Sequence, residues 1–186
     1  MTQTKELNNE YISDYDFDAV IIGGGHAAAE AALACARTGL RTCMLILNLD
    51  SIGLLACNPS IGGTSKGHLV REIDALGGQM GIEADKSLIQ LRMLNTSKGA
   101  AVQSLRAQID KNRYHTNMKA TLENTDNLRV RQAEAVELLT DGKKITGVRT
   151  LYNQIYNAKA VIVATGVYLK SNTIIGTITE NKGPSG

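Results

Sequence analysis

The 186-residue chain has no tryptophan, one phenylalanine, two prolines and three cysteines. Three cysteines in a chain of this length exclude a disulfide scaffold, and the odd count suits a reducing compartment. With 18 glycines and two prolines, collagen-like and disordered classes are excluded as well. The longest apolar stretches, such as Ala19–Ile22 and Ala160–Ala164, are strand-sized and far shorter than the roughly 18–20 residues of a transmembrane span. The three cysteines have no metal-ligand spacing, so we expect no metal site.

The charges are almost balanced, with 20 basic and 18 acidic residues. Near neutrality gives no general argument for nucleic-acid binding. The segment 66–119, however, holds nine basic and five acidic residues, a net charge of +4. The segment 51–65 has no charged residue at all and is rich in glycine and small polar residues. It is either a buried connecting loop or a loop that lies against a large flat ligand.

The first fifty residues have the pattern of a βαβ unit. Phe17–Ile22 is apolar on both faces, which is typical of a central parallel strand. Three glycines follow, and an alanine-rich helix is predicted over His26–Thr38, ending at Gly39. A second strand is predicted over Arg41–Leu47. Met1–Asp18 has neither a basic n-region nor an apolar h-region, so we expect a polar tail over residues 1–14 and a cytoplasmic location.

The rest of the chain changes from helical to strand periodicity. Two further helices are predicted over Lys66–Leu76 and Ala101–Glu123. Short strand-like runs follow, separated by turn residues, and they predict an antiparallel meander and a last apolar strand: Glu134–Leu139, Ile145–Leu151, Gln154–Ala158 and Ala160–Ala164. The expected fold is therefore α/β, a Rossmann-like FAD/NAD(P)-binding domain with a parallel sheet and an antiparallel β-meander over residues 15–186.

The glycine turn matches the dinucleotide-binding fingerprint G-x-G-x-x-G/A. The first glycine allows a sharp turn, the second lets the backbone approach a pyrophosphate, and the third position must be small so that helix and strand pack. The helix N-terminus then offers free N–H groups to the phosphates. The match follows a strand and opens a helix, which favours nucleotide binding over a purely structural turn. Its residues are Gly23, Gly24, Gly25, His26, Ala27 and Ala28.

The identity of the nucleotide depends on two later features. The position about 20 residues further on, where an acid normally binds the ribose, is Asn48, so this position does not separate nicotinamide from flavin. The meander is followed by a strand that ends in Ala164, Thr165 and Gly166. This layout, in which the last strand returns beside the first, is that of two-dinucleotide-type flavoproteins and favours FAD.

Longer motifs carry a specific resemblance. The ordered blocks are Asn48–Asp50, Cys57–Gly63, Lys66–Gly78 and Leu94–Gly99. With these blocks the chain, from about Tyr15 to its end, resembles the tRNA uridine 5-carboxymethylaminomethyl modification enzymes. Because members of that family are several times longer, the resemblance implies an N-terminal fragment that lacks later parts of the flavin site. An unpaired strand edge is then expected, and with it aggregation or dimerisation.

The resemblance implies a concrete activity. Members of the family bind FAD, are reduced by NADH and form homodimers. With a tRNA-modification GTPase they add a carboxymethylaminomethyl or aminomethyl group to carbon 5 of the tRNA wobble uridine, with methylenetetrahydrofolate as the one-carbon donor. Two alternatives stay open. One is a related folate-dependent, flavin-using tRNA methyltransferase, and the other is a non-catalytic fragment that only binds nucleotide.

The resemblance also assigns site residues. The segment Gly23–Ala28 corresponds to the pyrophosphate loop, although the family usually has glycine at the position of Ala28. The adenine-contacting strand corresponds to Ala133–Val136, and Ala135 is the expected backbone contact. Cys57, in the uncharged loop, is either a nucleophile towards carbon 6 of the uridine, which would activate carbon 5, or a small buried hydrophobe.

Other single residues keep two interpretations each. His26 either donates to a phosphate or caps its helix while facing solvent. Lys66, His68 and Arg71 either meet a phosphate or form a solvated helix face, and the charge of +4 over 66–119 either steers tRNA or is ordinary surface. Asn95, Ser97 and Lys98 form a polar turn with or without a substrate role. Cys35 and Cys43 are expected in the core.

Overall fold

The computed structural model describes residues 15–183. The predicted tail over residues 1–14 and the last three residues, 184–186, lie outside the described residues. Among the described residues, no helix combines the length and the apolar character needed to cross a bilayer.

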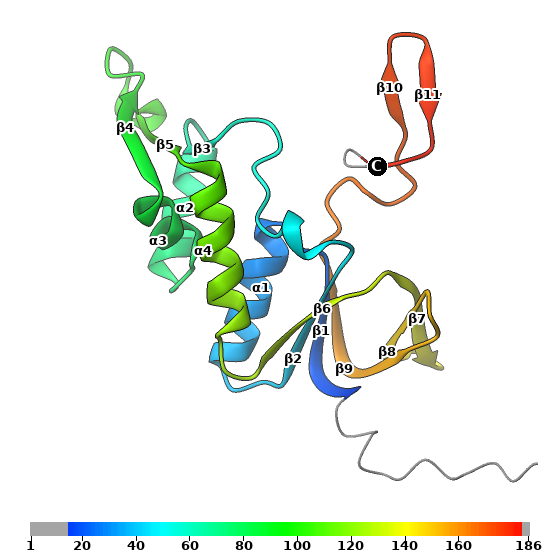
Figure 1. Cartoon of the computed structure of the whole chain (residues 1–186). Helices are drawn as coiled ribbons and strands as arrows, with labels where there is room; N and C mark the ends of the chain where they lie inside the picture. The colour runs from blue at the N-terminus through cyan, green and yellow to red at the C-terminus, as the bar shows by residue number, and fades with distance from the viewer. Residues whose placement is uncertain (1–14, 184–186) are drawn as a thin grey trace, which may run out of the picture.

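A six-stranded sheet forms the centre of the molecule (Figure 1). Its strand order is β6-β2-β1-β9-β8-β7. The first four of these strands are parallel, and β8 pairs antiparallel with both β9 and β7. The expected return of the last strand beside the first is thereby confirmed. The strands are β1 (Asp16–Ile22), β2 (Thr42–Ile46), β6 (Leu128–Gln132), β7 (Ala135–Asp141), β8 (Lys144–Thr150) and β9 (Ile155–Val163).

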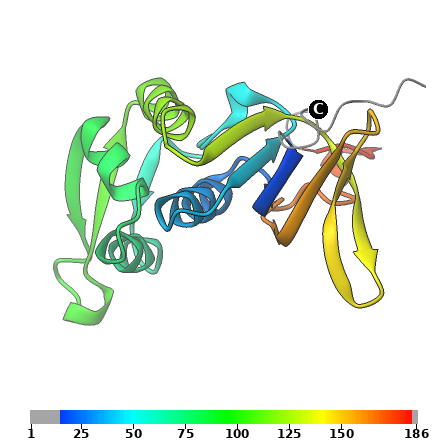
Figure 2. The same ribbon diagram turned by 90° about the horizontal axis from the view of Figure 1, so that it is seen from below.

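Two helices cover one face of the parallel strands, α1 (His26–Arg37) and α4 (Lys111–Glu123), and Figure 2 shows them side by side. Ile21 and Met44 of the sheet pack there with Leu33 of α1 and Met118 of α4. The meander covers the other face of the parallel strands. Its buried residues include Val148 and Tyr156, which pack with Phe17, Val20, Cys43 and Leu45. Both faces of β1 and β2 are therefore buried, which explains their continuous apolar sequences.

A separate lobe over residues 60–109 stands beside this core (Figure 1). Its three-stranded antiparallel sheet has the order β3-β5-β4. A short 3₁₀ turn, η2 (Leu49–Ser51), begins the connection from β2 to the lobe. The elements of the lobe are β3 (Ser60–Gly62), α2 (Lys66–Ala75), α3 (Met80–Lys86), β4 (Leu88–Leu94), η3 (Ala100–Val102) and β5 (Ser104–Ile109).

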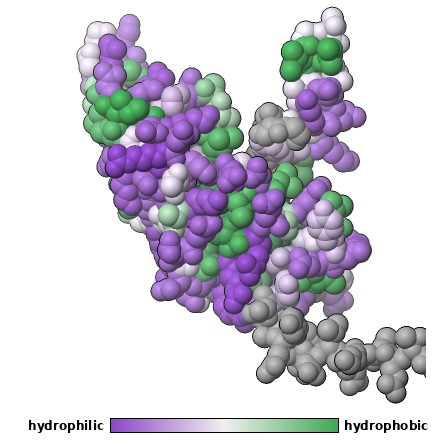
Figure 3. Space-filling view, viewed as in Figure 1, coloured by the Kyte–Doolittle hydropathy of each residue, from purple (hydrophilic) through white to green (hydrophobic). Residues whose placement is uncertain are grey.

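A small antiparallel hairpin, β10 (Thr173–Ile175) and β11 (Ile178–Glu180), also projects from the core. Figure 1 shows it rising from the core on the side opposite to the lobe. Apolar side chains are exposed on both the lobe and the hairpin: Ile89 and Leu91 on β4, and Ile174 and Ile175 on β10. Figure 3 shows green, apolar surface on the lobe and near the end of the hairpin.

The single helix predicted over Ala101–Glu123 is wrong. The segment contains η3, strand β5 and helix α4 in succession. The side chain of Asp110 accepts hydrogen bonds from the backbone N–H groups of Asn112 and Arg113, at 3.0 Å each, and so caps α4 at its true start. Before Asp110 the chain pairs with β3 on one side and β4 on the other. This tertiary pairing overrides the helical spacing of the apolar residues.

The two strands predicted over Gln154–Ala158 and Ala160–Ala164 are one strand, β9. Its first residues pair with β8, and from Asn157 onwards it also pairs with β1. The break expected at Lys159 is absent because this exposed residue keeps the strand alternation, and its Nζ pairs with Asp18 at 2.7 Å. The remaining strands of the meander, and helices α1 and α2, lie where the sequence predicts them.

A carboxylate from the core holds the lobe in place. Glu30 of α1 accepts hydrogen bonds from the backbone N–H groups of Gln79, at 2.9 Å, and Met80, at 2.6 Å. These groups lie at the start of α3, where N–H donors have no partner within the helix. Arg37 of α1 adds a bond of 2.7 Å to the carbonyl of Gly77 and a second bond to the Gln79 side chain. These charge-assisted hydrogen bonds add to an apolar contact between the two regions, since Ile61, Met80 and Ile109 of the lobe belong to the same buried cluster as α1 and the sheet.

Candidate functional site

The candidate site lies where the parallel strands end. β1, β2, β6 and β9 all run in the same direction, so their carboxyl ends meet at one edge of the sheet. In open α/β sheets ligands bind at this edge. The segments that follow these strands hold the sequence-predicted cofactor residues: Gly23–Ala28 after β1, Asn48 after β2, Ala135 after β6, and Thr165 and Gly166 after β9.

The glycine turn has the geometry that its sequence predicts. Gly23 has φ of +129°, and a Cβ there would lie 2.3 Å from the carbonyl oxygen of Ala164. A side chain at this position would separate β1 from β9. Gly25 faces open space, because a Cβ there would meet nothing within 4 Å. At the third position of the motif, Ala28 is fully buried against the sheet, so alanine meets the requirement for a small residue.

The N-terminus of α1 has no local cap. Its N-cap residue is Gly25, no side chain bonds the first N–H groups, and the first turn contains no acidic residue. These donors and the positive end of the helix dipole therefore point out of the turn without a partner from the cap. The combination of open space at Gly25 and free donors is the arrangement that accommodates a phosphate group.

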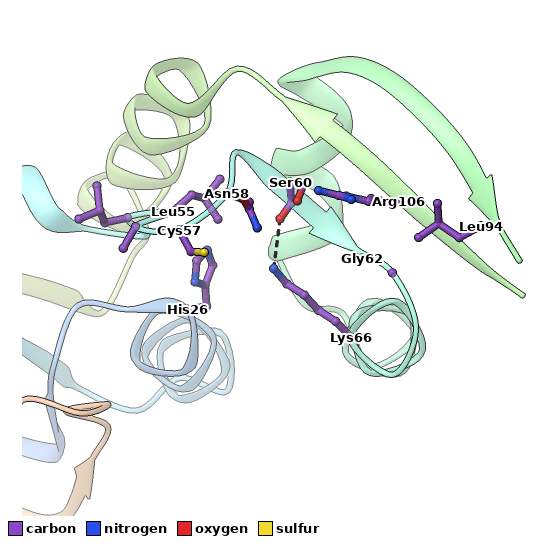
Figure 4. Close-up of a pocket in the computed structure, with 12 residues that line it drawn as sticks. His26, Leu55, Cys57, Asn58, Ser60, Gly62, Lys66, Leu94 and Arg106 are labelled. Carbon is purple, nitrogen blue, oxygen red and sulfur yellow. Dashed lines mark hydrogen bonds between the residues drawn. The ribbon is translucent and has the colours of Figure 1, made fainter. Parts of the chain in front are cut away.

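A cavity of about 510 Å³ opens beside this turn. It is lined by His26 of α1, by the loop that contains Cys57, by Lys66 and by one face of the lobe sheet (Figure 4). The uncharged segment 51–65 is only partly buried: Ile52 and Leu55 lie in the core, whereas Ala56, Cys57 and Asn58 are exposed and line the cavity. Its contact with a large ligand is therefore possible in this geometry.

His26 is half-buried and does not cap its helix, because the N-cap residue is Gly25 and no side chain makes a cap hydrogen bond. Its ring packs against Tyr114 of α4, with ring centroids 5.7 Å apart, and its Nε2 atom is buried without a hydrogen-bond partner among residues 15–183. Burial, with a smaller contribution from Lys66, lowers the pKa of His26 to about 4. The imidazole is therefore neutral at physiological pH, and Nε2 is oriented without a partner beside the cavity.

The other predicted residues separate into two groups. Lys66 lines the cavity, and its Nζ atom donates to the carbonyl of Ser60 at 3.1 Å. His68 and Arg71 are exposed on α2 and do not line it. Asn95 is engaged structurally, since its Nδ2 atom donates to Thr64 Oγ1 at 3.0 Å and to the carbonyl of Val102 at 2.9 Å. Ser97 and Lys98 lie in the exposed turn after β4.

Asn48 caps the short η2 turn. Its Oδ1 atom accepts from the backbone N–H of Asp50 at 2.8 Å. Ala135 begins β7 and is half-buried, and the preceding Ala133 donates to the carbonyl of Ile46 at 2.9 Å, which holds this segment against the end of β2. Cys43 is buried and Cys35 is half-buried, and both pack with the core, as expected.

Sequence reasoning missed the lobe side of the cavity. Ser60, Gly62, Leu94 and Arg106 all line it. Ser60, Gly62 and Leu94 lie inside the blocks Cys57–Gly63 and Leu94–Gly99 but were not assigned to a site, and Arg106 falls in the segment that the sequence wrongly predicts as a helix. The alternation of Leu105, Ala107 and Ile109 was the only indication of a strand here, and it places Arg106 on the opposite face from these three apolar residues.

Comparisons with known proteins agree on one family. The family profile described as "Glucose inhibited division protein A" matches residues 18–186. The chain is 56% identical over 170 residues to the tRNA uridine 5-carboxymethylaminomethyl modification enzyme MnmG of Alkaliphilus metalliredigens. It is 58% identical over 171 residues to the MnmG of Clostridium botulinum. These matches cover 91% and 92% of this chain and 27% of each relative, so the chain spans about a quarter of their length.

Solved structures give the same relationship. GidA of Aquifex aeolicus superposes with a TM-score of 0.86 and 52% identity, over 89% of this chain and 28% of that one. A GidA-related protein from Thermus thermophilus has a TM-score of 0.62 at 21% identity, covering 88% of this chain and 59% of that chain, which shows the shared fold alone.

Proposed function

Since the chain belongs to the glucose inhibited division protein A family, we propose that it is the FAD-binding part of an enzyme that modifies tRNA at the wobble uridine. The modification is the addition of a carboxymethylaminomethyl or aminomethyl group to carbon 5 of the base. The observation that carries the proposal is the glycine turn Gly23–Ala28, with an uncapped helix N-terminus, at the edge of the parallel sheet and next to a cavity.

The residues of this edge fit FAD. The open space at Gly25 and the free N–H groups at the start of α1 would hold the pyrophosphate. Asn48 uses only Oδ1 in its turn, so its Nδ2 amide remains to donate to a ribose hydroxyl. The backbone of Ala135 would contact the adenine, and Thr165 and Gly166 would lie against the flavin side of the cofactor. When bound, FAD supplies reversible hydride transfer.

Within this proposal the chain's own residues have distinct roles. Cys57 is the candidate nucleophile towards carbon 6 of the uridine, because its thiol is exposed and its loop lines the cavity. His26 lines the cavity, and its buried Nε2 would reach a polar group of the bound ligand after a shift of its side chain or of the neighbouring loop. Neither role requires a charged carboxylate, and none of the described residues that line the cavity is acidic.

The wider reaction follows from the family. We propose NADH as the reductant and methylenetetrahydrofolate as the one-carbon donor, with a tRNA-modification GTPase as the partner protein. We also propose that the whole enzyme is a cytoplasmic homodimer, and that residues 15–186 form the incomplete FAD-binding domain. A flavin-using tRNA methyltransferase is not favoured, because the relatives are named as 5-carboxymethylaminomethyl enzymes. A turnover assay distinguishes the non-catalytic alternative. Product formed by this chain alone would exclude a fragment that only binds nucleotide.

The visible absorbance spectrum of the purified chain tests the proposal. FAD is added, the excess is removed by desalting, and the flavin band is measured. We expect a band that persists, because the turn and the meander together provide the binding edge. A folded chain that stays colourless would contradict the proposal that these residues hold FAD by themselves.

A charge at the glycine turn sharpens this test. Gly25 has φ of −76° and faces open space, so Gly25→Asp is compatible with the fold and even provides an N-cap for α1. The carboxylate would occupy the phosphate position and repel it. We expect loss of flavin retention with unchanged or slightly raised thermal stability. The matched control is Gly99→Asp, since Gly99 is also an N-cap, with φ of −58° and open space around it.

A further inference from the structure

One wall of the cavity is a single face of the lobe sheet. β3 and β4 pair with β5 in antiparallel register, so residues directly opposite one another project to the same side. Ser60 is opposite Gln108, Gly62 is opposite Arg106, and Leu94 is opposite Ser104. Because Ser60, Gly62, Leu94 and Arg106 all line the cavity, this polar face of the sheet is the one that borders it.

The segments that build this wall contain no acidic residue. Residues 51–71 and 88–109 have neither Asp nor Glu, although the whole chain has 18 acidic residues. Five basic residues occur in the same two segments: Lys66, Arg71, Arg92, Lys98 and Arg106. The net charge of +4 over residues 66–119 is therefore concentrated on the lobe strands and the start of α2, while its five acidic residues lie on α2, α3 and the cap of α4.

Two arginines stand directly opposite each other on this face. Arg92 of β4 is the register partner of Arg106 of β5. Like charges in this position repel each other and destabilise the pairing. Both side chains are exposed, and neither guanidinium has a hydrogen bond or ion pair with any of residues 15–183. Figure 4 shows Arg106 extended across the wall towards Ser60, whose carbonyl holds Lys66.

A phosphate group would relieve this repulsion. Guanidinium groups bind phosphate oxygens through paired N–H donors, so two adjacent arginines can hold one phosphate or two successive phosphates. Under the proposed function the FAD pyrophosphate would be held at the uncharged glycine turn, on the His26 side of the cavity, and not at this wall. Among residues 15–183, no Phe, Tyr or Trp on which a base could stack lines the cavity. The wall is therefore suited to the backbone of a nucleic acid rather than to its bases.

We propose that Arg92 and Arg106, together with Lys66, bind the phosphates of the RNA strand whose uridine enters the cavity. This proposal rests on the proposed function, because that function makes tRNA the substrate. The arginine pair positions the strand on the lobe, and the base then reaches past Lys66 towards the loop of Cys57. The contacts carry no sequence information, so they act on any RNA that presents an unpaired uridine.

The test measures RNA binding and flavin retention separately. A fluorescently labelled anticodon stem–loop RNA is titrated with the chain, with and without FAD, over a salt series. Each phosphate contact on a single strand contributes about 0.7 to the slope of log K against log salt. We expect Arg92→Gln and Arg106→Gln each to lower the slope by about that amount and to weaken binding several-fold. Flavin retention after desalting should stay unchanged in both variants.

Two further variants serve as controls. Lys143→Gln removes one positive charge from the exposed turn between β7 and β8, far along the chain from the wall, and should leave the slope unchanged. Arg106→Lys keeps the charge and should retain the slope, even if Arg106→Gln disturbs the lobe. RNA binding with the predicted slopes but no retained flavin would support the phosphate site and contradict the FAD proposal. Equal slopes in all variants, no RNA binding by the parent chain, or loss of flavin instead of RNA would overturn the phosphate site.

Discussion

The core and the lobe use apolar residues in opposite ways. All five residues of β2 are buried, whereas six of the seven residues of β4 are exposed. Helix α1 has five buried residues and α2 has none. Both strands contain several apolar residues, although only β2 was predicted from the sequence. The difference teaches that the core is held together by packing on two faces, while the lobe presents one face to the cavity and leaves much of its apolar surface open.

The first prediction compares two leucines in helix interiors. Leu33 of α1 is 0% exposed and Leu69 of α2 is 58% exposed. Leu33→Ala should lower the free energy of unfolding by about 2–5 kcal/mol, because it opens a cavity under the sheet. Leu69→Ala should change it by at most about 0.5 kcal/mol. Urea unfolding followed by circular dichroism measures both, and similar losses in the two variants would show that α2 is packed as tightly as α1.

The same contrast explains which elements could be predicted from the sequence. β1, α1, β2 and the meander follow from periodicity and glycine positions, because burial imposes a regular pattern on their residues. In the strands of the lobe, exposure removes that constraint, although the exposed helix α2 was predicted correctly. β4 was not predicted, and β5 was assigned to a helix, because its strand state depends on pairing with residues about 15 and 45 positions away.

The candidate site shows the same division. The residues of the glycine turn, Thr165 and Gly166 could be proposed as cofactor contacts from the sequence, because a turn that follows a strand has a recognisable motif. The proposed phosphate-binding pair, Arg92 and Arg106, could not be predicted from the sequence, since only the strand register brings the two residues together. The orientation of His26 against Tyr114 also depends on a contact between helices far apart in the sequence.

The second prediction concerns His26, where the core meets the cavity. Its pKa falls from an ordinary value of 6.5 to about 4 in the folded chain, chiefly because it is buried. The unfolded chain therefore binds more protons between these values, and stability falls as the pH drops from about 6.5 to about 4. The full loss is about 3 kcal/mol. Replacing His26 with phenylalanine should flatten the dependence of unfolding free energy on pH over this range.

The matched control for His26→Phe is His68→Phe, since His68 is exposed on α2. This variant should keep the pH dependence of the parent chain. An identical pH dependence in His26→Phe and the parent would mean that the His26 imidazole is protonated as readily in the folded chain as in the unfolded one.

The third prediction separates the lobe from the core. Glu30→Ala leaves the N–H groups of Gln79 and Met80 without their acceptor, at a cost of about 2 kcal/mol. Hydrogen exchange should become faster for the amides of α3 and its neighbours in the lobe, and stay slow for β1 and β2. Glu30→Gln retains an acceptor oxygen and should have a smaller effect. If amide exchange in β1 became faster to the same extent as in the lobe, the two regions would unfold as one unit.

The fourth prediction concerns the chemical modification of cysteine thiols, which is expected to change stability least. Thiol reactivity compares the two regions most directly. Cys57 is exposed beside the cavity, whereas Cys43 is buried in β2 and burial raises its pKa to about 12. A thiol reagent should therefore modify Cys57 in the native chain and Cys43 only after unfolding, and Cys57→Ser should remove the fast phase. If the uncharged loop lies against the flavin, added FAD should slow the modification of Cys57. Unchanged reactivity in a chain that retains FAD would place the loop away from the cofactor and remove the support for Cys57 as the nucleophile.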